Sequence, residues 1–266
     1  MTKFVTVTLA ALVLFAPVAL WAATESDWPM DEFSPDLHNQ PSLQSGANTY
    51  INYCLGCHSL KFQRYVRTAD DLGISEDLAK ELLVHTGQKI GDHMTTAMPA
   101  DKAKNWFGGP PPDLTMVART KGGPWLYNYL RAFYLDDQRP LGVNNGVFEN
   151  VGMPHVMLEL QGIVRKGCAQ VPVLHEDGYE LRDELVPGKK ITKEDCSQLV
   201  LEEGSGSQTP EEFDQTIYDL VNFLTYVGEP YALERQRIGV YVLLFLLILF
   251  GFAYLLNREY WKDVKH

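Results

Sequence analysis

The apolar residues divide the chain into a central body with a long uncharged run at each end. Residues 4–23 carry no charge, follow Lys3 and finish in small residues, which is typical of a secretory signal peptide over residues 1–23. The run is long for such a peptide, so an N-terminal anchor that is not removed is the alternative. A second uncharged run, Ile238 to Leu256, predicts a membrane-spanning helix, which we place at residues 235–257.

Between these runs, the spacing of apolar residues predicts a mainly α body over residues 24–234. The windows with helical spacing are 42–53, 73–87, 125–134 and 211–226. In the second window Ile74, Leu78 and Leu82 lie four positions apart, and in the first Ser42 or Ser45 is the expected N-cap. Turn residues predict irregular loops over 24–41, 105–124 and 137–155, and residues 161–210 form a polar excursion. No β-rich pattern is present.

The fourth helical window is the clearest of the set. Phe213, Ile217, Val221 and Leu224 are spaced to share one face of a helix. Thr209 can cap its first turn and Pro210 can occupy the first helical position. We therefore expect a capped amphipathic helix shortly before the membrane span.

Charge and cysteine content narrow the classes of partner and the cellular compartment. The chain has 34 acidic and 23 basic residues and a net charge of −11, which argues against nucleic acid and favours a basic protein partner. A merely soluble acidic surface is the alternative. Cys168 and Cys196 form an even pair in an exported chain, which predicts a disulfide bond, with two buried thiols as the alternative.

The other two cysteines belong to the motif Cys54-Leu-Gly-Cys57-His58. Two thiols at this spacing can form thioethers with the vinyl groups of a haem, and the adjacent imidazole can bind the iron. A zinc site would need a second close pair of ligands, and a thioredoxin-like dithiol would not need the histidine. The motif therefore predicts one covalent haem c, held by Cys54 and Cys57 with His58 as an axial ligand.

The ligand on the opposite face of the iron is not decided by the local pattern. The candidates are Met94, Met98, Met116, Met153, Met157, His93 and His155. Met98 and Met153 stand out because each precedes a proline, which stiffens the loop that carries the ligand. These two methionines remain tied.

Several motifs in order give the chain a resemblance to the cytochrome c1 family, the haem subunits of ubiquinol:cytochrome c reductase (the cytochrome bc1 complex), in a bacterial form. They cover about residues 40–265. The segments are Cys54-Leu-Gly-Cys57-His58-Ser59-Leu60 with Arg64-Tyr65, Gly109-Pro-Pro-Pro-Asp113-Leu114, Gly152-Met153-Pro154, and Leu224-Thr-Tyr-Val-Gly-Glu229-Pro230 running into Arg235.

The resemblance implies roles for further residues. It implies that Met153, rather than Met98, is the second axial ligand. It also implies that the loop with Pro111, Asp113 and Leu114 packs near the haem edge. The family places a basic side chain after this loop to meet a haem propionate, and here Lys121 stands where arginine is common, with Arg119 nearby. Lysine lacks the bidentate fork of arginine. Residues 161–210 resemble a lineage-specific insertion.

The function that this resemblance implies is electron transfer without bond chemistry on a substrate. The haem would take electrons from the Rieske iron–sulfur protein and pass them to a soluble or membrane-bound c-type cytochrome, with cytochrome b as a further partner. The alternatives are a cytochrome subunit of a terminal oxidase or nitric oxide reductase, a haem sensor with an open sixth site, and a membrane protein without haem. We expect the body on the periplasmic side of the bacterial inner membrane, with residues 258–266 as a cytoplasmic tail.

Overall fold

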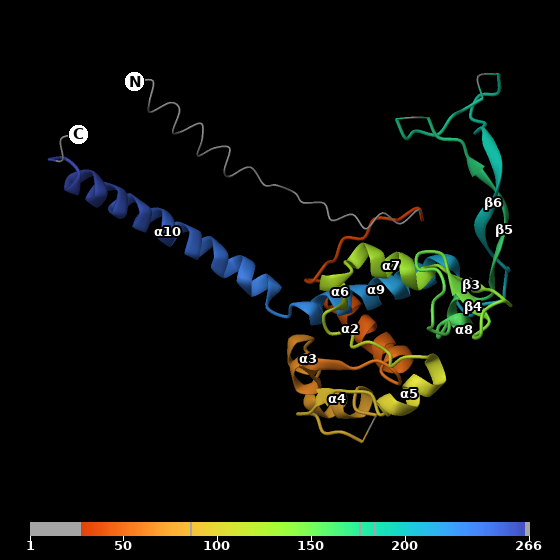
Figure 1. Ribbon diagram of the computed structural model, residues 1–266, viewed down its shortest axis with the longest axis horizontal. Coiled ribbons are helices and arrows are strands. Elements are labelled where there is room, and N and C mark those ends of the chain that lie inside the picture. Colours follow the sequence, from red (N-terminus) through yellow and green to blue (C-terminus); the bar gives the residue numbers. More distant parts are fainter. Residues whose placement is uncertain (1–27, 86, 176, 184, 264–266) are drawn as a thin grey trace.

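Two crossing helices, α2 (Gln40–Thr49) and α9 (Pro210–Gly228), form the centre of the body (Figure 1). The computed structural model describes residues 28–85, 87–175, 177–183 and 185–263, without the side chains of residues 196 and 197. The predicted signal peptide, residues 1–23, lies outside the described residues.

Helix α9 forms as the pattern predicts. Its four predicted core positions are all buried, and they are Phe213, Ile217, Val221 and Leu224. The Thr209 hydroxyl accepts a hydrogen bond from the Glu212 N–H, and the Glu212 carboxylate accepts one from the Thr209 N–H. This capping box satisfies two backbone donors that the first turn of a helix otherwise leaves unpaired.

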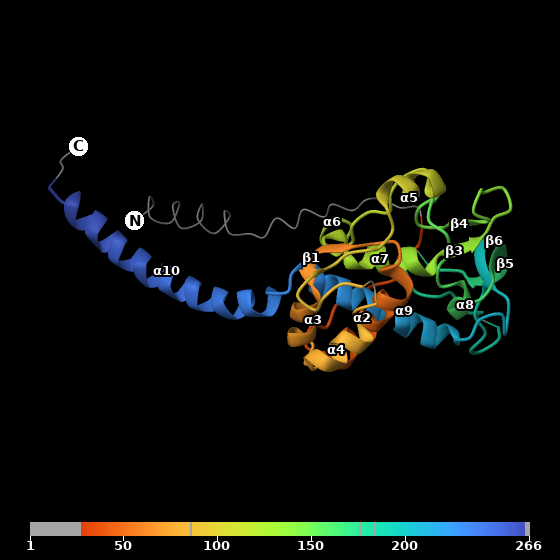
Figure 2. The same cartoon turned by 90° about the horizontal axis from the view of Figure 1, so that it is seen from below.

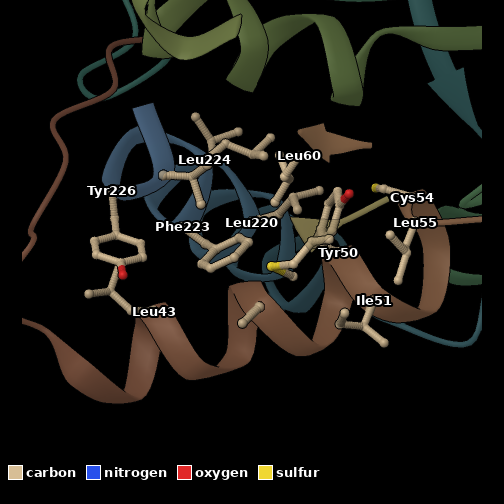
Figure 3. Close-up of a cluster of buried hydrophobic side chains, with 14 of the residues drawn as sticks. Leu43, Tyr50, Ile51, Cys54, Leu55, Leu60, Leu220, Phe223, Leu224 and Tyr226 are labelled. Atoms are coloured by element: carbon tan, nitrogen blue, oxygen red, sulfur yellow. The ribbon is translucent and has the colours of Figure 1, made fainter. Parts of the chain in front are cut away.

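Helix α2 packs against α9 through a row of large apolar side chains. Figure 3 shows this row. Leu43 comes from α2, Tyr50 and Ile51 follow directly after α2, and Leu220 and Phe223 come from α9. The helix begins earlier than predicted, because the Asn39 side chain accepts the Ser42 N–H and caps it. Ser42 itself is buried and donates to Asp219 at 2.6 Å.

In the part of the chain that the structure describes, six shorter helices lie around this pair. They are α3 (Tyr65–Asp71), α4 (Glu76–Leu82), α5 (Ala100–Phe107), α6 (Val117–Thr120), α7 (Gly123–Arg131) and α8 (Leu158–Gln161). The predicted loop over 105–124 is wrong in part, since α5, α6 and α7 all take residues from it. The predicted helix over 73–87 is shorter, and its expected inner face is wrong. Leu78 and Leu82 are exposed, whereas Ala79 and Leu83 are buried.

The described residues form three two-stranded antiparallel sheets, which the sequence pattern did not predict. The pairs are β1 (Leu60–Arg64) with β2 (His93–Met94), β3 (Phe133–Leu135) with β4 (Val143–Asn145), and β5 (Val164–Pro172) with β6 (Thr192–Leu201). The polar excursion is the β5–β6 hairpin, which extends from the end of the body opposite α10 (Figure 1). The residues of its first strand are exposed or half-buried apart from Val164, and they show no regular alternation of large apolar and polar side chains, which is the pattern that identifies a half-buried strand.

Helix α10 (Ala232–Tyr260) follows α9 and leads away from the body, as Figure 2 shows. Its most apolar window is not buried against the body, and by length and composition the helix can cross a membrane. Glu229 and Arg235 pair at the junction, where Pro230 separates the two helices. Helix α10 contains the whole of the predicted span, residues 235–257, and continues for a few residues beyond it at each end.

Candidate haem site

The cysteine motif follows directly from helix α2. The helix continues as one π-helical segment, η1 (Tyr50–Cys54), a conformation found often at functional sites. The Cys54 carbonyl then accepts hydrogen bonds from the N–H groups of Cys57 and His58, at 3.0 and 2.8 Å. The buried Tyr50 hydroxyl donates to the His58 carbonyl at 2.7 Å. These bonds close the motif into one tight turn.

Neither cysteine of the turn takes part in a disulfide bond. Cys54 is buried beside Leu55 in the core (Figure 3), and burial raises its pKa to about 12. Cys57 is half-buried, and burial raises its pKa as well. Within the described residues, no group of three His, Cys, Asp or Glu side chains converges as metal ligands would. The arrangement therefore offers the zinc interpretation no second pair of ligands.

The turn opens onto a cavity of about 280 Å³, close to the lower end of the range of small-molecule and cofactor pockets. Its lining is mainly apolar and comes from four parts of the chain. The lining residues are Cys57, His58, Phe107, Gly109, Pro110, Pro111, Pro112, Tyr129, Val151, Gly152, Met153, Pro154 and Val156. The cavity is thus lined by one cysteine and the histidine of the motif, together with one methionine.

The ring of His58 is held by the proline loop. Its Nδ1 lies 2.7 Å from the Pro112 carbonyl oxygen, a distance at which Nδ1–H donates and Nε2 keeps its lone pair. Burial lowers the pKa of His58, which favours the neutral imidazole that binds a metal. A metal-bound histidine characteristically donates its other ring N–H to a carbonyl or carboxylate. His58 therefore has the hydrogen-bond arrangement of an axial ligand.

Two contacts fix the proline loop against the haem motif. The Leu114 N–H donates to the Ser59 carbonyl at 2.9 Å. The Asp113 carboxylate accepts from the N–H groups of Lys61 at 2.8 Å and Thr115 at 3.1 Å. Asp113 thus joins the loop to β1, and it does not line the cavity.

Among the described residues, Met153 is the one methionine that lines the cavity. Met94 is fully buried in the core and accepts a hydrogen bond from Thr68. Met157 is also buried in the core, and Met116 is exposed. Met98 lies outside the lining, although its N–H donates to Thr96 close to the haem motif. The geometry thus favours Met153 over Met98, while its role as a ligand remains a prediction.

The two histidine candidates also lie outside the lining. His155 stacks on Phe133 with ring centroids 5.0 Å apart, and burial lowers its pKa to about 4. His93 begins the short strand β2, where it pairs with Arg64. Neither side chain lines the cavity that His58 faces.

Of the remaining predicted haem contacts, one lines the cavity and the others lie outside its lining. Pro111 lines the cavity, and Leu114 packs against the main core. Arg119 and Lys121 do not line it. The Arg119 stem lies near Gly228, and the Lys121 ammonium lies 5.3 Å from the Trp125 ring centroid. Their predicted contact with a haem propionate therefore remains a prediction.

Sequence reasoning did not identify Phe107, Tyr129, Val151 or Val156 as cavity residues. Nothing in the sequence linked Tyr129 to Met153. The link exists only in three dimensions, because the Tyr129 hydroxyl donates to Met153 Sδ at 3.5 Å. Tyr129 is buried enough to raise its pKa to about 12, so the hydroxyl keeps its proton at neutral pH.

The predicted Cys168–Cys196 disulfide lies in the β5–β6 hairpin. Cys168 takes part in a disulfide bond, and it lies at a register shift between the pairs Gly167–Gln198 and Ala169–Asp195. The side chain of residue 196 is outside the described residues, so the pairing itself remains a prediction.

These features fit a covalently attached haem. The cavity is mainly apolar, and its lining contains the Cys57 thiol, a neutral imidazole and a thioether. Thioether and imidazole are the axial ligands of an electron-carrying c-type haem.

Comparison with known proteins agrees with this site. The model of the Cytochrome C1 family matches residues 28–264. Cytochrome c1 of Allochromatium vinosum is 48% identical over 96% of this chain and 98% of its own length. The ammonia monooxygenase gamma subunit of Nitrosomonas europaea is 39% identical over 96% of this chain and 97% of its own length. Cytochrome c1 of Rhodospirillum rubrum is 28% identical over 86% of this chain and 84% of its own length.

The family match covers the haem motif, the cavity and the membrane helix together. The mainly α fold, with small sheets and one C-terminal apolar helix, agrees with this assignment. The chain therefore belongs to the cytochrome c1 family, whose members carry one covalent haem c and serve as a membrane-anchored electron-transfer subunit.

Proposed function

We propose that this chain passes electrons from a Rieske iron–sulfur protein to a c-type cytochrome, through a haem bound by Cys54, Cys57, His58 and Met153. The observation that supports this most directly is the shared cavity, which brings His58 and Met153 together from distant parts of the chain. When bound there, the haem supplies reversible one-electron chemistry at its iron. No bond of a substrate has to break, so no general acid, base or nucleophile is required.

The chain's own residues set the conditions for that chemistry. The mainly apolar lining would lower the local dielectric constant around a bound haem. The carbonyl of Pro112 orients the His58 ring and strengthens it as a donor. Met153 would close the opposite face, and a thioether there favours the ferrous state and raises the reduction potential.

The partners that we propose follow from the family. They are cytochrome b, the Rieske iron–sulfur protein and a c-type cytochrome that accepts the electron. A net charge of −11 would attract a basic acceptor over distances comparable to the screening length. We place the body on the periplasmic side, because haem attachment to a C-x-x-C-H motif accompanies export, with α10 as the anchor in the inner membrane.

Replacement of the proposed ligand tests the assignment. In Met153→Leu, we expect loss of the methionine–iron charge-transfer band, a lower reduction potential and binding of carbon monoxide to the reduced protein. Met98→Leu is the matched control, since Met98 also precedes a proline but lies outside the cavity lining, and it should change none of these. The opposite pattern would overturn the ligand assignment, and carbon monoxide binding by the unmodified protein would favour a haem sensor.

Purification in mild detergent tests the partners. We expect cytochrome b and a Rieske protein to copurify with the full-length chain. Copurification with the subunits of a terminal oxidase or nitric oxide reductase instead would refute the proposed complex.

A further inference from the structure

The hydroxyl of Tyr129 is the one polar side-chain group that the described structure directs at the proposed methionine ligand. It lies 3.5 Å from Met153 Sδ, and both side chains line the same cavity. This is also the one hydrogen bond of that hydroxyl among the residues that the structure describes. The Tyr129 hydroxyl can therefore donate to the Met153 sulfur, and no other acceptor among the described residues competes for its proton.

The position of Tyr129 is fixed on several sides. Its ring stacks on Trp125, one turn earlier in α7, with centroids 4.8 Å apart and an interplanar angle of 11°. The ring also meets Phe133 edge-on, at 5.3 Å and 70°. Aromatic contacts of this kind hold a ring in one rotamer. Because the ring is held by its neighbours, the position of the hydroxyl is fixed as well.

The loop that carries Met153 is tied to the same helix. Asn145 is completely buried, and its amide donates to the Tyr129 carbonyl at 2.7 Å. Its side-chain oxygen accepts from the N–H groups of Val147 at 2.9 Å and Phe148 at 3.0 Å, early in the loop. One buried residue thus fixes both the helix of the donor and the loop of the acceptor.

From this geometry we propose that Tyr129 is a positioning residue that raises the haem reduction potential by donating a hydrogen bond to Met153 Sδ. The inference rests on the proposed function, because it requires Met153 to be the axial ligand. A thioether sulfur can bind iron with one lone pair and accept a weak hydrogen bond with another. The bond draws electron density from the sulfur, which then stabilises the ferric iron less. The ferrous state gains in relative terms, so the potential rises.

Redox titration of the full-length chain tests this inference. In Tyr129→Phe, the ring and its stacking partners remain and only the donor is lost. At a fixed ambient potential, we expect the ferrous-to-ferric ratio to fall by about two- to tenfold, where tenfold equals 59 mV for one electron. The methionine–iron charge-transfer band should persist, because the ligand itself is unchanged.

Tyr127→Phe is the matched control, because Tyr127 lies on the same helix but does not line the cavity. Its ring packs against Phe33 and Arg131, so loss of its hydroxyl should leave the ratio unchanged. A second variant with 3-fluorotyrosine at position 129 keeps the fold and has a more acidic, stronger donor. It should raise the ratio above that of the unmodified protein.

Three results would overturn the inference. The ratio in Tyr129→Phe could equal that in Tyr127→Phe, the fluorinated variant could lower the ratio, or Tyr129→Phe could lose the charge-transfer band. Met153→Leu separates failure of this inference from failure of the proposed function. If Met153→Leu keeps the band, the ligand assignment and this inference both fail. If it loses the band while Tyr129→Phe has no effect, only this inference fails.

Discussion

Gly46 lies where helix α2 crosses helix α9, and the space beside it is already filled. A Cβ atom at this position would lie 2.0 Å from the Asp219 carbonyl oxygen and 2.7 Å from the Phe223 Cβ. Contacts under 3.0 Å are essentially never made by real Cβ atoms, and the nearest atom is backbone, which cannot rotate away. The Gly46→Ala variant must therefore separate the two helices by about 1 Å.

The magnitude of the effect follows from what the separation disturbs. Overpacking of a core costs about 1–3 kcal/mol. The buried Ser42–Asp219 hydrogen bond, 2.6 Å long, would be stretched at a cost of about 1 kcal/mol. Alanine is better than glycine in a helix by about 1 kcal/mol, which offsets part of this. We expect a net loss of about 2 kcal/mol, or a fall of roughly 4–8 °C in melting temperature for a body of this size.

Thermal unfolding of the full-length chain in detergent, followed by helical circular dichroism, measures the effect. Gly91→Ala is the matched control, because a Cβ at Gly91 would meet nothing within 4 Å. If Gly46→Ala melts at the same temperature as Gly91→Ala, the close approach of the two helices is not a constraint and the reasoning is refuted. The position matters for function as well, since α2 continues through η1 into Cys54.

Three further outcomes are expected. Asp113→Ala removes the acceptor of two backbone N–H groups and should lower unfolding free energy by about 1–3 kcal/mol; an unchanged melting temperature would contradict this. Asn145→Ala removes three hydrogen bonds around Tyr129 and the following loop, so hydrogen exchange in residues 146–153 should accelerate at least about tenfold; unchanged exchange would argue against that role. Mass spectrometry without reductant should find Cys168 linked to Cys196, and two alkylatable thiols in the unfolded, unreduced protein would rule the bridge out.

Local signals account for the parts of the fold that were predicted. Helix α9 has its apolar period and its capping box within one short stretch, and α10 contains a long uncharged apolar run, so both were found close to their true bounds. The hairpin β5–β6 was missed because its strands pair across a long connection and its first strand has no regular alternation of large apolar and polar residues. The face of α4 was misjudged because Leu78 and Leu82 have the right spacing, yet the neighbouring elements cover Ala79 and Leu83 instead.

The chemistry of attachment could be predicted from the cysteine motif alone, because two cysteines and a histidine at fixed spacing need only one turn of chain to act together. The membrane helix could be predicted from the sequence as well, since length and apolar composition are local properties. Met153 and Met98 could be distinguished on geometric grounds only in the tertiary structure. The same holds for the contact between the Tyr129 hydroxyl and Met153 Sδ. The physical reason is that the cavity is assembled from four distant segments. Which side chains face it depends on how α2, α7 and α9 pack, and local spacing carries no information about that packing.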